Sequence, residues 1–279
     1  MLSRKLKALV IGLDGATWHT LQPILESLPN LRRLVQGGAS GVLHSTIPDL
    51  TPPAWTSFMT GQEPGKHGIF WFGRNDTNLV FDPANSSQIR SETLWQMLNR
   101  HCLSTAVFNV PMTYPPHPVD GFMVAGMLTP DLQSTFTHPA ELAKTLRDQG
   151  YILDIRWKEY LNDDPLLLLD RLANMLERRG EALLSLLDTH PVDALVAVFV
   201  VLDRVYHCLW GYAVDSDGTL PDYERIHKRV VALTVQADAW IGCLLERVAT
   251  DGLVLVMSDH GHGPMRAEVF LNRWLLDLG

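Results

Sequence analysis

The sequence predicts an α/β protein, a three-layer α/β/α sandwich with a mainly parallel central sheet and a small inserted cap. Short apolar or β-branched runs alternate along the chain with longer helical stretches, which is typical of parallel strands joined by helical crossovers. The chain has 279 residues, of which 46% are hydrophobic, so it can bury one large core. We therefore interpret residues 1–279 as a single domain.

Six runs are predicted strands because they are short and rich in apolar or β-branched residues. The first follows a basic N-terminus and superficially resembles a signal peptide, but Asp14 ends its apolar run too early for that. The central four or five resemble the strands of a doubly wound sheet. In chain order the predicted strands are Ala8–Leu13, Gly41–Thr46, Thr105–Asn109, Gly121–Ala125, Ala194–Val201 and Leu253–Met257.

The longer stretches between these strands are predicted helices. They are Thr20–Gln36, Trp55–Thr60, Glu92–Arg100, His138–Asp148, Pro165–Leu187 and Asp222–Val248. Two segments depart from the alternation. Residues 128–165 are polar, aromatic and Pro-containing, with no obvious sheet strand, so we interpret them as an inserted cap over a site. Residues 75–90 are polar and predict a loop or a small hairpin.

Charge and composition exclude several classes of partner. The formal net charge is −8, so the chain has no basic field of the kind that binds nucleic acid. No apolar run approaches the roughly 20 residues that a membrane-spanning helix needs, so we expect no membrane partner. The three cysteines are odd in number and far apart, which argues against a disulfide framework and favours a reducing, cytoplasmic compartment.

Polar side chains follow four of the predicted strands. In open α/β sheets, ligands bind beyond the carboxyl ends of the strands, so these side chains are the candidate functional residues. They are Asp14 after the first strand, Thr51 after the second, Asp203 and His207 after the fifth, and Asp259 and His260 after the last.

Each of these residues alone has a structural explanation. A carboxylate such as Asp14 often caps a helix, and Thr51 before two prolines is first of all an N-cap. Asp203 and His207, four residues apart, can share an exposed helix face. Together, however, three carboxylates, two imidazoles and a hydroxyl make the mixed oxygen and nitrogen set that suits zinc, or manganese when oxygen dominates.

Longer fragments around these residues carry a family resemblance. They include IGLDGATW, STIPDLTPPAWTSFMTGQEPGKHGIFWF, NVPMTYPP, VFVVLDRVYHCLWGY and VMSDHGHGP. In this order they resemble the alkaline phosphatase superfamily, in its type I phosphodiesterase and nucleotide pyrophosphatase branch, and most closely its predicted phosphohydrolases or phosphomutases. The resemblance extends from Val10 to Leu275. It implies that residues 1–279 form an alkaline phosphatase-like catalytic domain.

The resemblance also implies a site with two divalent metals, zinc in the first place and manganese as the alternative. One metal would be held by Asp14, Thr51, Asp259 and His260, and the other by Asp203 and His207. In the family, the threonine at the Thr51 position is the nucleophile and is transiently phosphorylated. Thr46 and Thr56 are nearby rivals, but the segment TPPAWTSFMTG aligns with the family's nucleophile segment at Thr51.

One ligand that the resemblance implies has no counterpart. The second metal in the family normally has another histidine, from a glycine-flanked segment well downstream, and this sequence stops at Gly279. We therefore expect the front part of a longer protein, or a shortened member with a weakened second metal. Relatives usually carry an aromatic or apolar residue at the position of His262, so we interpret this histidine as lying outside the ligand set, close behind it or facing solvent.

The expected function is a metal-dependent phosphoester hydrolase of the phosphodiesterase or nucleotide pyrophosphatase type, acting through a phosphothreonine intermediate. Its expected substrate is a small, nucleotide-like phosphoester, and the preference for diesters is implied by the resemblance alone. Two alternatives stay open, a phosphomutase of the same superfamily and a truncated, noncatalytic protein that binds a metal or phosphate. A sulfatase is excluded because none of the cysteines lies in a CxPxR-type segment.

Overall fold

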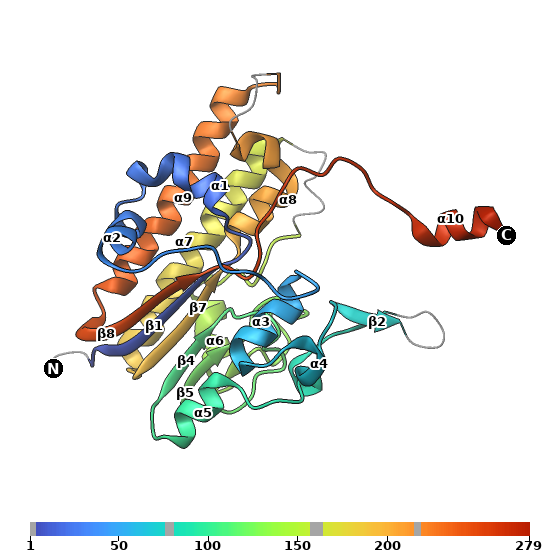
Figure 1. Ribbon diagram of the computed structural model, residues 1–279. Helices are drawn as coiled ribbons and strands as arrows, with labels where there is room; N and C mark the ends of the chain where they lie inside the picture. The colour runs from blue at the N-terminus through green and yellow to red at the C-terminus, as the bar shows by residue number, and fades with distance from the viewer. Residues whose placement is uncertain (1–3, 76–80, 157–163, 215–218) are drawn as a thin grey trace.

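The computed structural model describes residues 4–75, 81–156, 164–214 and 219–279. A six-stranded sheet lies at the centre of this part of the chain, and helices cover both of its faces (Figure 1). The predicted fold class is thereby confirmed. Across the sheet, the strands follow the order β6 (Thr137–His138), β5 (Gly121–Val124), β4 (Thr105–Phe108), β7 (Ala194–Phe199), β1 (Leu6–Leu13) and β8 (Val248–Met257).

The sheet is parallel except at one edge. β4, β5, β7, β1 and β8 all run in the same direction, and β6 pairs antiparallel with β5. β1 lies between β7 and β8, so the carboxyl ends of these three strands are neighbours. β4 and β7 are buried along their whole length, which explains why their sequences are continuous apolar runs instead of alternating ones.

Two helical layers enclose the sheet. The long helices α7 (Pro165–Thr189) and α9 (Tyr223–Leu245) pack together over one face, and α3 (Thr51–Thr60) and α5 (Leu94–Arg100) lie on the other (Figure 1). The remaining helices are α1 (Trp18–Leu21), α2 (Pro29–Gly37), α4 (Pro64–His67), α6 (Leu142–Asp148), α8 (Val201–Ala213) and α10 (Leu271–Leu278), with 3₁₀ turns η1 (Gln22–Ser27) and η2 (Ser86–Gln88). Figure 1 shows α10 standing away from the rest of the molecule.

Five of the six predicted strands are present, and the strand predicted at Gly41–Thr46 is wrong. This segment belongs to no sheet, although it contains β-branched and apolar residues. Val42 is 77% exposed and Leu43 is 66% exposed, so the apolar residues face outward instead of entering a core. The Ser45 hydroxyl donates to the main-chain oxygen of Asp259 at 2.6 Å, which attaches the segment beside the end of β8.

Several predicted helices also differ from the structure. α3 begins at Thr51 instead of Trp55, and α6 begins at Leu142 because His138, the predicted start, lies in β6. The single helix expected over Thr20–Gln36 is divided into α1, η1 and α2, because Pro29 cannot continue a helix and instead begins α2. The helix predicted over Asp222–Val248 ends at Leu245, and Val248 already starts β8.

The segment expected to be a cap contains part of the sheet. We expected no strand in residues 128–165, but β6 lies there and forms the antiparallel edge, followed by α6. Residues 157–163 of the predicted cap lie outside the described residues. The polar segment 75–90 was predicted as a loop or small hairpin, and the structure has the hairpin, formed by β2 (Gly73–Asn75) and β3 (Phe81–Pro83).

Close packing between Gly12 and Trp55 fixes α3 against the sheet. A Cβ atom at Gly12, in β1, would lie only 2.1 Å from Cη2 of Trp55, so only glycine allows the indole ring to approach. Trp55 itself is completely buried. This contact places the first turn of α3 near the carboxyl end of β1.

Two further observations concern membranes and disulfides. None of the helices in the described ranges is long and apolar enough to span a membrane. All three cysteines are free, as their odd number and wide separation predicted.

Candidate active site

The carboxyl ends of β1, β7 and β8 bring the predicted acidic residues together. Asp14 directly follows β1, and Asp259 lies just beyond β8. Asp203 lies in the first turn of α8, the helix that follows β7. All three carboxylates are buried, with exposed fractions of 5% or less. Because β1 lies between the other two strands, the strand order itself creates this acidic centre.

Among the described residues, one of the two carboxylate oxygens of Asp14 receives a hydrogen bond. Its Oδ2 atom accepts a hydrogen bond from the indole Nε1 of Trp55 at 3.0 Å. Its Oδ1 atom is buried and has no hydrogen-bond partner among the described residues. Burial raises the pKa of this carboxyl well above its ordinary value, and the nearby carboxylates of Asp259 and Asp203 raise it further.

Asp259 repeats this arrangement. Its Oδ1 atom accepts from the main-chain N–H of Gly15 at 3.1 Å, and its buried Oδ2 atom has no hydrogen-bond partner in the described ranges. Burial raises the pKa of Asp259 to about 7. The Nε2 atom of His260 lies 3.4 Å from Asp259 Oδ2 and 3.8 Å from Asp14 Oδ1. The imidazole therefore lies between the two carboxylates.

Thr51 meets the same imidazole. Its hydroxyl Oγ1 lies 3.0 Å from His260 Nε2. Nδ1 of His260 lies 3.1 Å from the carbonyl oxygen of Gly261, an acceptor, so Nδ1 carries the ring hydrogen and Nε2 accepts from the Thr51 hydroxyl. The rival threonines are engaged elsewhere: the Thr46 hydroxyl donates to the Pro48 carbonyl and the Thr56 hydroxyl to the Pro52 carbonyl, each at 2.7 Å.

The position of Thr51 follows from the local sequence. It is the first residue of α3, and the two prolines after it are tolerated in a first turn, where N–H groups have no intrahelical acceptor. The prolines also remove their own N–H groups. Among the first three residues of α3, only Thr51 therefore has an N–H to offer an anion, fewer than a helix N-terminus ordinarily provides.

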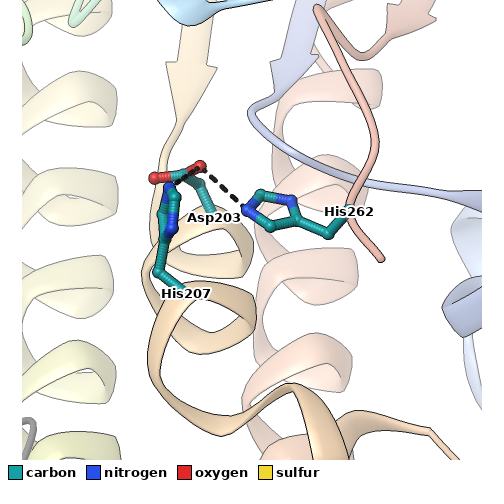
Figure 2. A group of neighbouring side chains, drawn as sticks. All are labelled: Asp203, His207 and His262. Atoms are coloured by element: carbon teal, nitrogen blue, oxygen red, sulfur yellow. Dashed lines mark ion pairs between the residues drawn. The ribbon is translucent and has the colours of Figure 1, made fainter. Parts of the chain in front are cut away.

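A second group of ligand atoms surrounds Asp203, as Figure 2 shows. His207 Nε2 lies 3.3 Å from Asp203 Oδ1, from one helical turn further along α8. His262 Nε2 lies 3.5 Å from the same oxygen and comes from the loop after β8. The side chain of His262 is only 11% exposed, so it lies within the cluster and does not face solvent.

The other oxygen of Asp203 is neutralised by a buried arginine that the sequence analysis missed. Arg204 Nη1 lies 2.6 Å from Asp203 Oδ2, and Arg204 Nη2 lies 2.7 Å from Asp154 Oδ2. Arg204 is 5% exposed. The signal in the sequence was a second charged residue, directly after Asp203 at the end of the apolar run in VFVVLDRVYH. Asp154 lies in the region interpreted as a cap, so this region supports the site through Arg204.

The donor atoms of the cluster fit divalent cations. Two groups each place three potential ligand atoms within 4.8 Å of one another, Asp14 with Asp203 and His260, and Asp203 with His207 and His262. Buried carboxylate oxygens need a hydrogen bond or a cation. One oxygen from each of the three acidic side chains lacks a hydrogen-bond partner within the described residues: Asp14 Oδ1, Asp203 Oδ1 and Asp259 Oδ2. Mixed carboxylate and imidazole donors of this kind are those of zinc sites.

Comparison with known proteins identifies the family of the chain. The family model described as type I phosphodiesterase/nucleotide pyrophosphatase matches residues 8–279. None of the curated proteins compared with the sequence is similar enough to match it.

Solved structures share the fold at low sequence identity. Phosphonoacetate hydrolase from Sinorhizobium meliloti 1021, in complex with phosphonoacetate, is 16% identical, with a TM-score of 0.64 over 99% of this chain and 62% of its own. The alkaline phosphatase PafA is 15% identical, with a TM-score of 0.60 over 94% of this chain and 64% of its own. Murine ectonucleotide pyrophosphatase/phosphodiesterase 5, in complex with AMP, is 15% identical, with a TM-score of 0.50 over 92% and 57%.

The chain thus spans 57–64% of the length of these solved structures. Their likeness shows a shared fold. The family model covers almost every residue, and on that ground the protein belongs to the type I phosphodiesterase/nucleotide pyrophosphatase family of phosphoester hydrolases.

Proposed function

We propose that the protein is a metal-dependent phosphoester hydrolase of the phosphodiesterase type, with Thr51 as its nucleophile. The observation that carries this proposal is the placement of the Thr51 hydroxyl, 3.0 Å from His260 Nε2 and beside the acidic centre at the ends of β1 and β8. A hydroxyl alone is a weak nucleophile, so its position next to groups that can hold a cation is what suggests activation.

The residues divide into two ligand sets in this proposal. Asp14, Thr51, Asp259 and His260 hold one divalent ion, and Asp203 and His207 hold the other. Zinc suits this donor set, and manganese is the alternative. Bound cations supply the positive charge that lowers the pKa of a coordinated hydroxyl and balances the oxygens of a phosphoryl group.

The protein's own residues orient the reaction. Thr51 Oγ1 attacks phosphorus, the new O–P bond forms as the bond to the leaving oxygen breaks, and the departing alcohol takes up a proton. Water then cleaves the phosphothreonine, which releases phosphate or a phosphomonoester and restores the Thr51 hydroxyl. Each displacement inverts phosphorus, so its configuration is retained overall. The N-terminus of α3 directs its positive dipole toward the anionic group.

The substrate proposed is a small phosphoester, nucleotide-like in class. AMP, bound to one protein of the same fold, supports the nucleotide-like class, and phosphonoacetate, a small phosphonate bound to another, supports a small phosphorus-containing anion. Transfer of the phosphoryl group from Thr51 to an alcohol instead of water would make the protein a phosphomutase. A protein that binds metal or phosphate without turnover is the noncatalytic alternative.

The test is hydrolysis of bis-p-nitrophenyl phosphate by the purified, zinc- or manganese-loaded protein. We expect Thr51→Ala to reduce kcat by at least about 1,000-fold, since the covalent step is lost. Thr51→Ser, which keeps a hydroxyl, should restore part of the activity. The matched control is Thr46→Ala, because the Thr46 hydroxyl donates to the Pro48 carbonyl and not to the candidate ligands.

Acid-quenched reactions with a labelled diester add a direct readout of the intermediate. Label should be recovered on Thr51 in the parent protein and not in Thr51→Ala. Undiminished turnover by Thr51→Ala would refute the nucleophile. Metal binding without any turnover would support the noncatalytic alternative, and isomerised sugar phosphate without free phosphate would support the mutase.

A further inference from the structure

We propose that His262 is the third protein ligand of the cation held by Asp203 and His207. This inference rests on the proposed function and goes beyond it, because the family resemblance assigns this role to a histidine from a later glycine-flanked segment. His262 instead comes from the loop that directly follows β8, two residues after His260.

The distances agree with a shared ion. A zinc ion with ligand bonds of about 2.0–2.2 Å in tetrahedral geometry separates its ligand atoms by about 3.4 Å. His207 Nε2 and His262 Nε2 lie 3.3 Å and 3.5 Å from Asp203 Oδ1. The three atoms form one group within 4.8 Å, and the two imidazole rings stand nearly perpendicular, at 87°. Figure 2 shows both rings directed at the same carboxylate.

A backbone contact determines that Nδ1 of His262 carries a hydrogen. Its Nδ1 atom lies 3.1 Å from the carbonyl oxygen of Gly15, which can only accept, so Nδ1 carries the hydrogen. In the neutral ring, the lone pair of Nε2 is then directed toward Asp203. A histidine whose second nitrogen donates to a main-chain carbonyl is the usual arrangement of a metal ligand.

Space for the ring is provided by Gly15. A Cβ atom at this position would lie 2.7 Å from Cε1 of His262, and Gly15 has φ +70°, which favours glycine. The turn after β1 therefore holds both clusters: its N–H bonds Asp259 and its carbonyl bonds His262.

Aromatic packing alone is the competing explanation. The ring of His262 lies 5.5 Å from that of Tyr206 and 6.4 Å from that of Trp210, between centroids. Such packing would explain why an aromatic residue is present. It does not explain why a ring nitrogen points at a buried carboxylate oxygen that lacks a hydrogen-bond partner among the described residues.

The two explanations are separated by His262→Phe and His262→Ala. Phenylalanine keeps the ring contacts with Tyr206 and Trp210 and removes the ligand atom, so it tests coordination without loss of packing. The matched control is His19→Ala, because His19 also stacks on Trp210, at 6.0 Å, but belongs to neither ligand group. Circular dichroism and thermal unfolding of each apoprotein check that it is folded.

The measurement is zinc binding to the chelator-stripped protein, by isothermal titration and by elemental analysis after gel filtration. We expect two equivalents for the parent protein and for His19→Ala, but only one tight equivalent for His262→Phe and His262→Ala. The weakened site should lose more than about 100-fold in affinity, since even residues behind the ligands are typically worth 10- to 100-fold. With cobalt in place of zinc, the visible absorption of one site should change in the His262 variants alone.

The outcomes distinguish the inference from the function on which it rests. Two unchanged equivalents in His262→Phe would overturn the role of His262 and leave the two-metal hydrolase standing. Failure of the parent protein to bind any metal would overturn both proposals.

Discussion

At the scale of single residues, the site has more buried acceptor atoms than donors. Asp14, Asp203 and Asp259 each place one oxygen where no hydrogen-bond donor of the described residues meets it. Without cations, proton uptake is the remaining way to reduce this charge, which is why burial raises the pKa of Asp14 and Asp259. Metal binding therefore displaces protons from Asp14 and Asp259.

Trp55→Phe tests how the indole orients Asp14. The substitution keeps an aromatic ring in the core and removes the donor to Asp14 Oδ2. We expect about 10-fold weaker metal binding, as for other residues that position a ligand, and about 1–3 kcal/mol of lost stability.

The matched control for this variant is Trp95→Phe. Trp95 is equally buried, and its Nε1 atom has no hydrogen-bond partner within the described part of the chain. Both variants shorten a buried ring, so a difference between them measures the hydrogen bond. Equal metal affinity in the two variants would show that the indole does not position Asp14.

At the scale of elements, two glycine-dependent contacts and the order of the strands determine where the candidate site forms. Gly12 lets α3 approach β1, and Gly15 turns the chain directly after Asp14. At the opposite ends of the strands, Asp193 connects the amino ends of β1, β4 and β7 through Arg4, Lys7 and Ser104. The amino ends of these strands thus carry contacts that stabilise the fold, and the carboxyl ends carry the candidate ligands.

Gly12→Ala should destabilise the protein by at least about 2 kcal/mol, because its methyl group would collide with Trp55 at 2.1 Å and with Val198 at 2.9 Å. Urea unfolding measures the loss. Gly65→Ala is the control, since nothing lies within 4 Å of the added atom, and it should change stability by less than about 0.5 kcal/mol. Similar urea midpoints for the two variants would mean that α3 shifts enough to accommodate the methyl group without loss of stability.

Asp193 predicts a defined response to acid. Burial raises its pKa, but bonds from Lys7, Ser104 and Arg4 outweigh burial and lower the pKa to about 2. As the pH falls below the ordinary pKa of 3.8, the unfolded chain takes up this proton before the folded protein does. The stabilisation is therefore present above about pH 4 and lost as the pH falls toward 2.

Asp193→Asn should remove this contribution, about 1–2 kcal/mol at pH 7, a range reduced from the full pKa shift because Arg4 and Lys7 are largely exposed. Guanidinium unfolding at pH 7 and pH 3 should show a smaller difference between parent and variant at pH 3. A constant difference would contradict the assignment.

The elements that the sequence predicted well are those whose own residues determine them. β4 and β7 are continuous apolar runs, and α7 begins at Pro165 behind the capping side chain of Asp164. The strand predicted at Gly41–Thr46 failed because a strand needs a partner, and its apolar residues revealed nothing about pairing. The short edge strand β6 is defined by pairing with β5 and has no pattern of its own.

At the scale of the whole molecule, the site joins segments from both ends of the chain. The Gly15 N–H and the Asp259 carboxylate that it bonds are 244 residues apart. The sequence predicted six candidate ligands from the ends of strands, and their roles remain predictions. Arg204 was missed, and His262 was interpreted as lying outside the ligand set, because a buried ion pair and a ring direction depend on tertiary contacts that no local pattern encodes.

Removal of metal should destabilise the whole molecule in a pH-dependent way. In the metal-free protein the pKa of Asp259 is about 7, above its ordinary value of 3.8, so its proton stabilises the folded state at low pH and this contribution is lost as the pH rises from about 4 to 7. The thermal midpoint of chelator-treated protein should therefore fall further below that of zinc-loaded protein at pH 8 than at pH 6. An equal deficit at both pH values would contradict this account.

The place of β1 between β7 and β8 has a consequence for biosynthesis. A ribosome makes β1 first, but its two neighbours in the sheet arrive only with residues 194–199 and 248–257. Asp14 emerges from the exit tunnel long before Asp259 and His260, so the proposed ion-binding pocket is incomplete until the loop after β8 has been made. Loading of the proposed site with metal therefore follows synthesis of that loop.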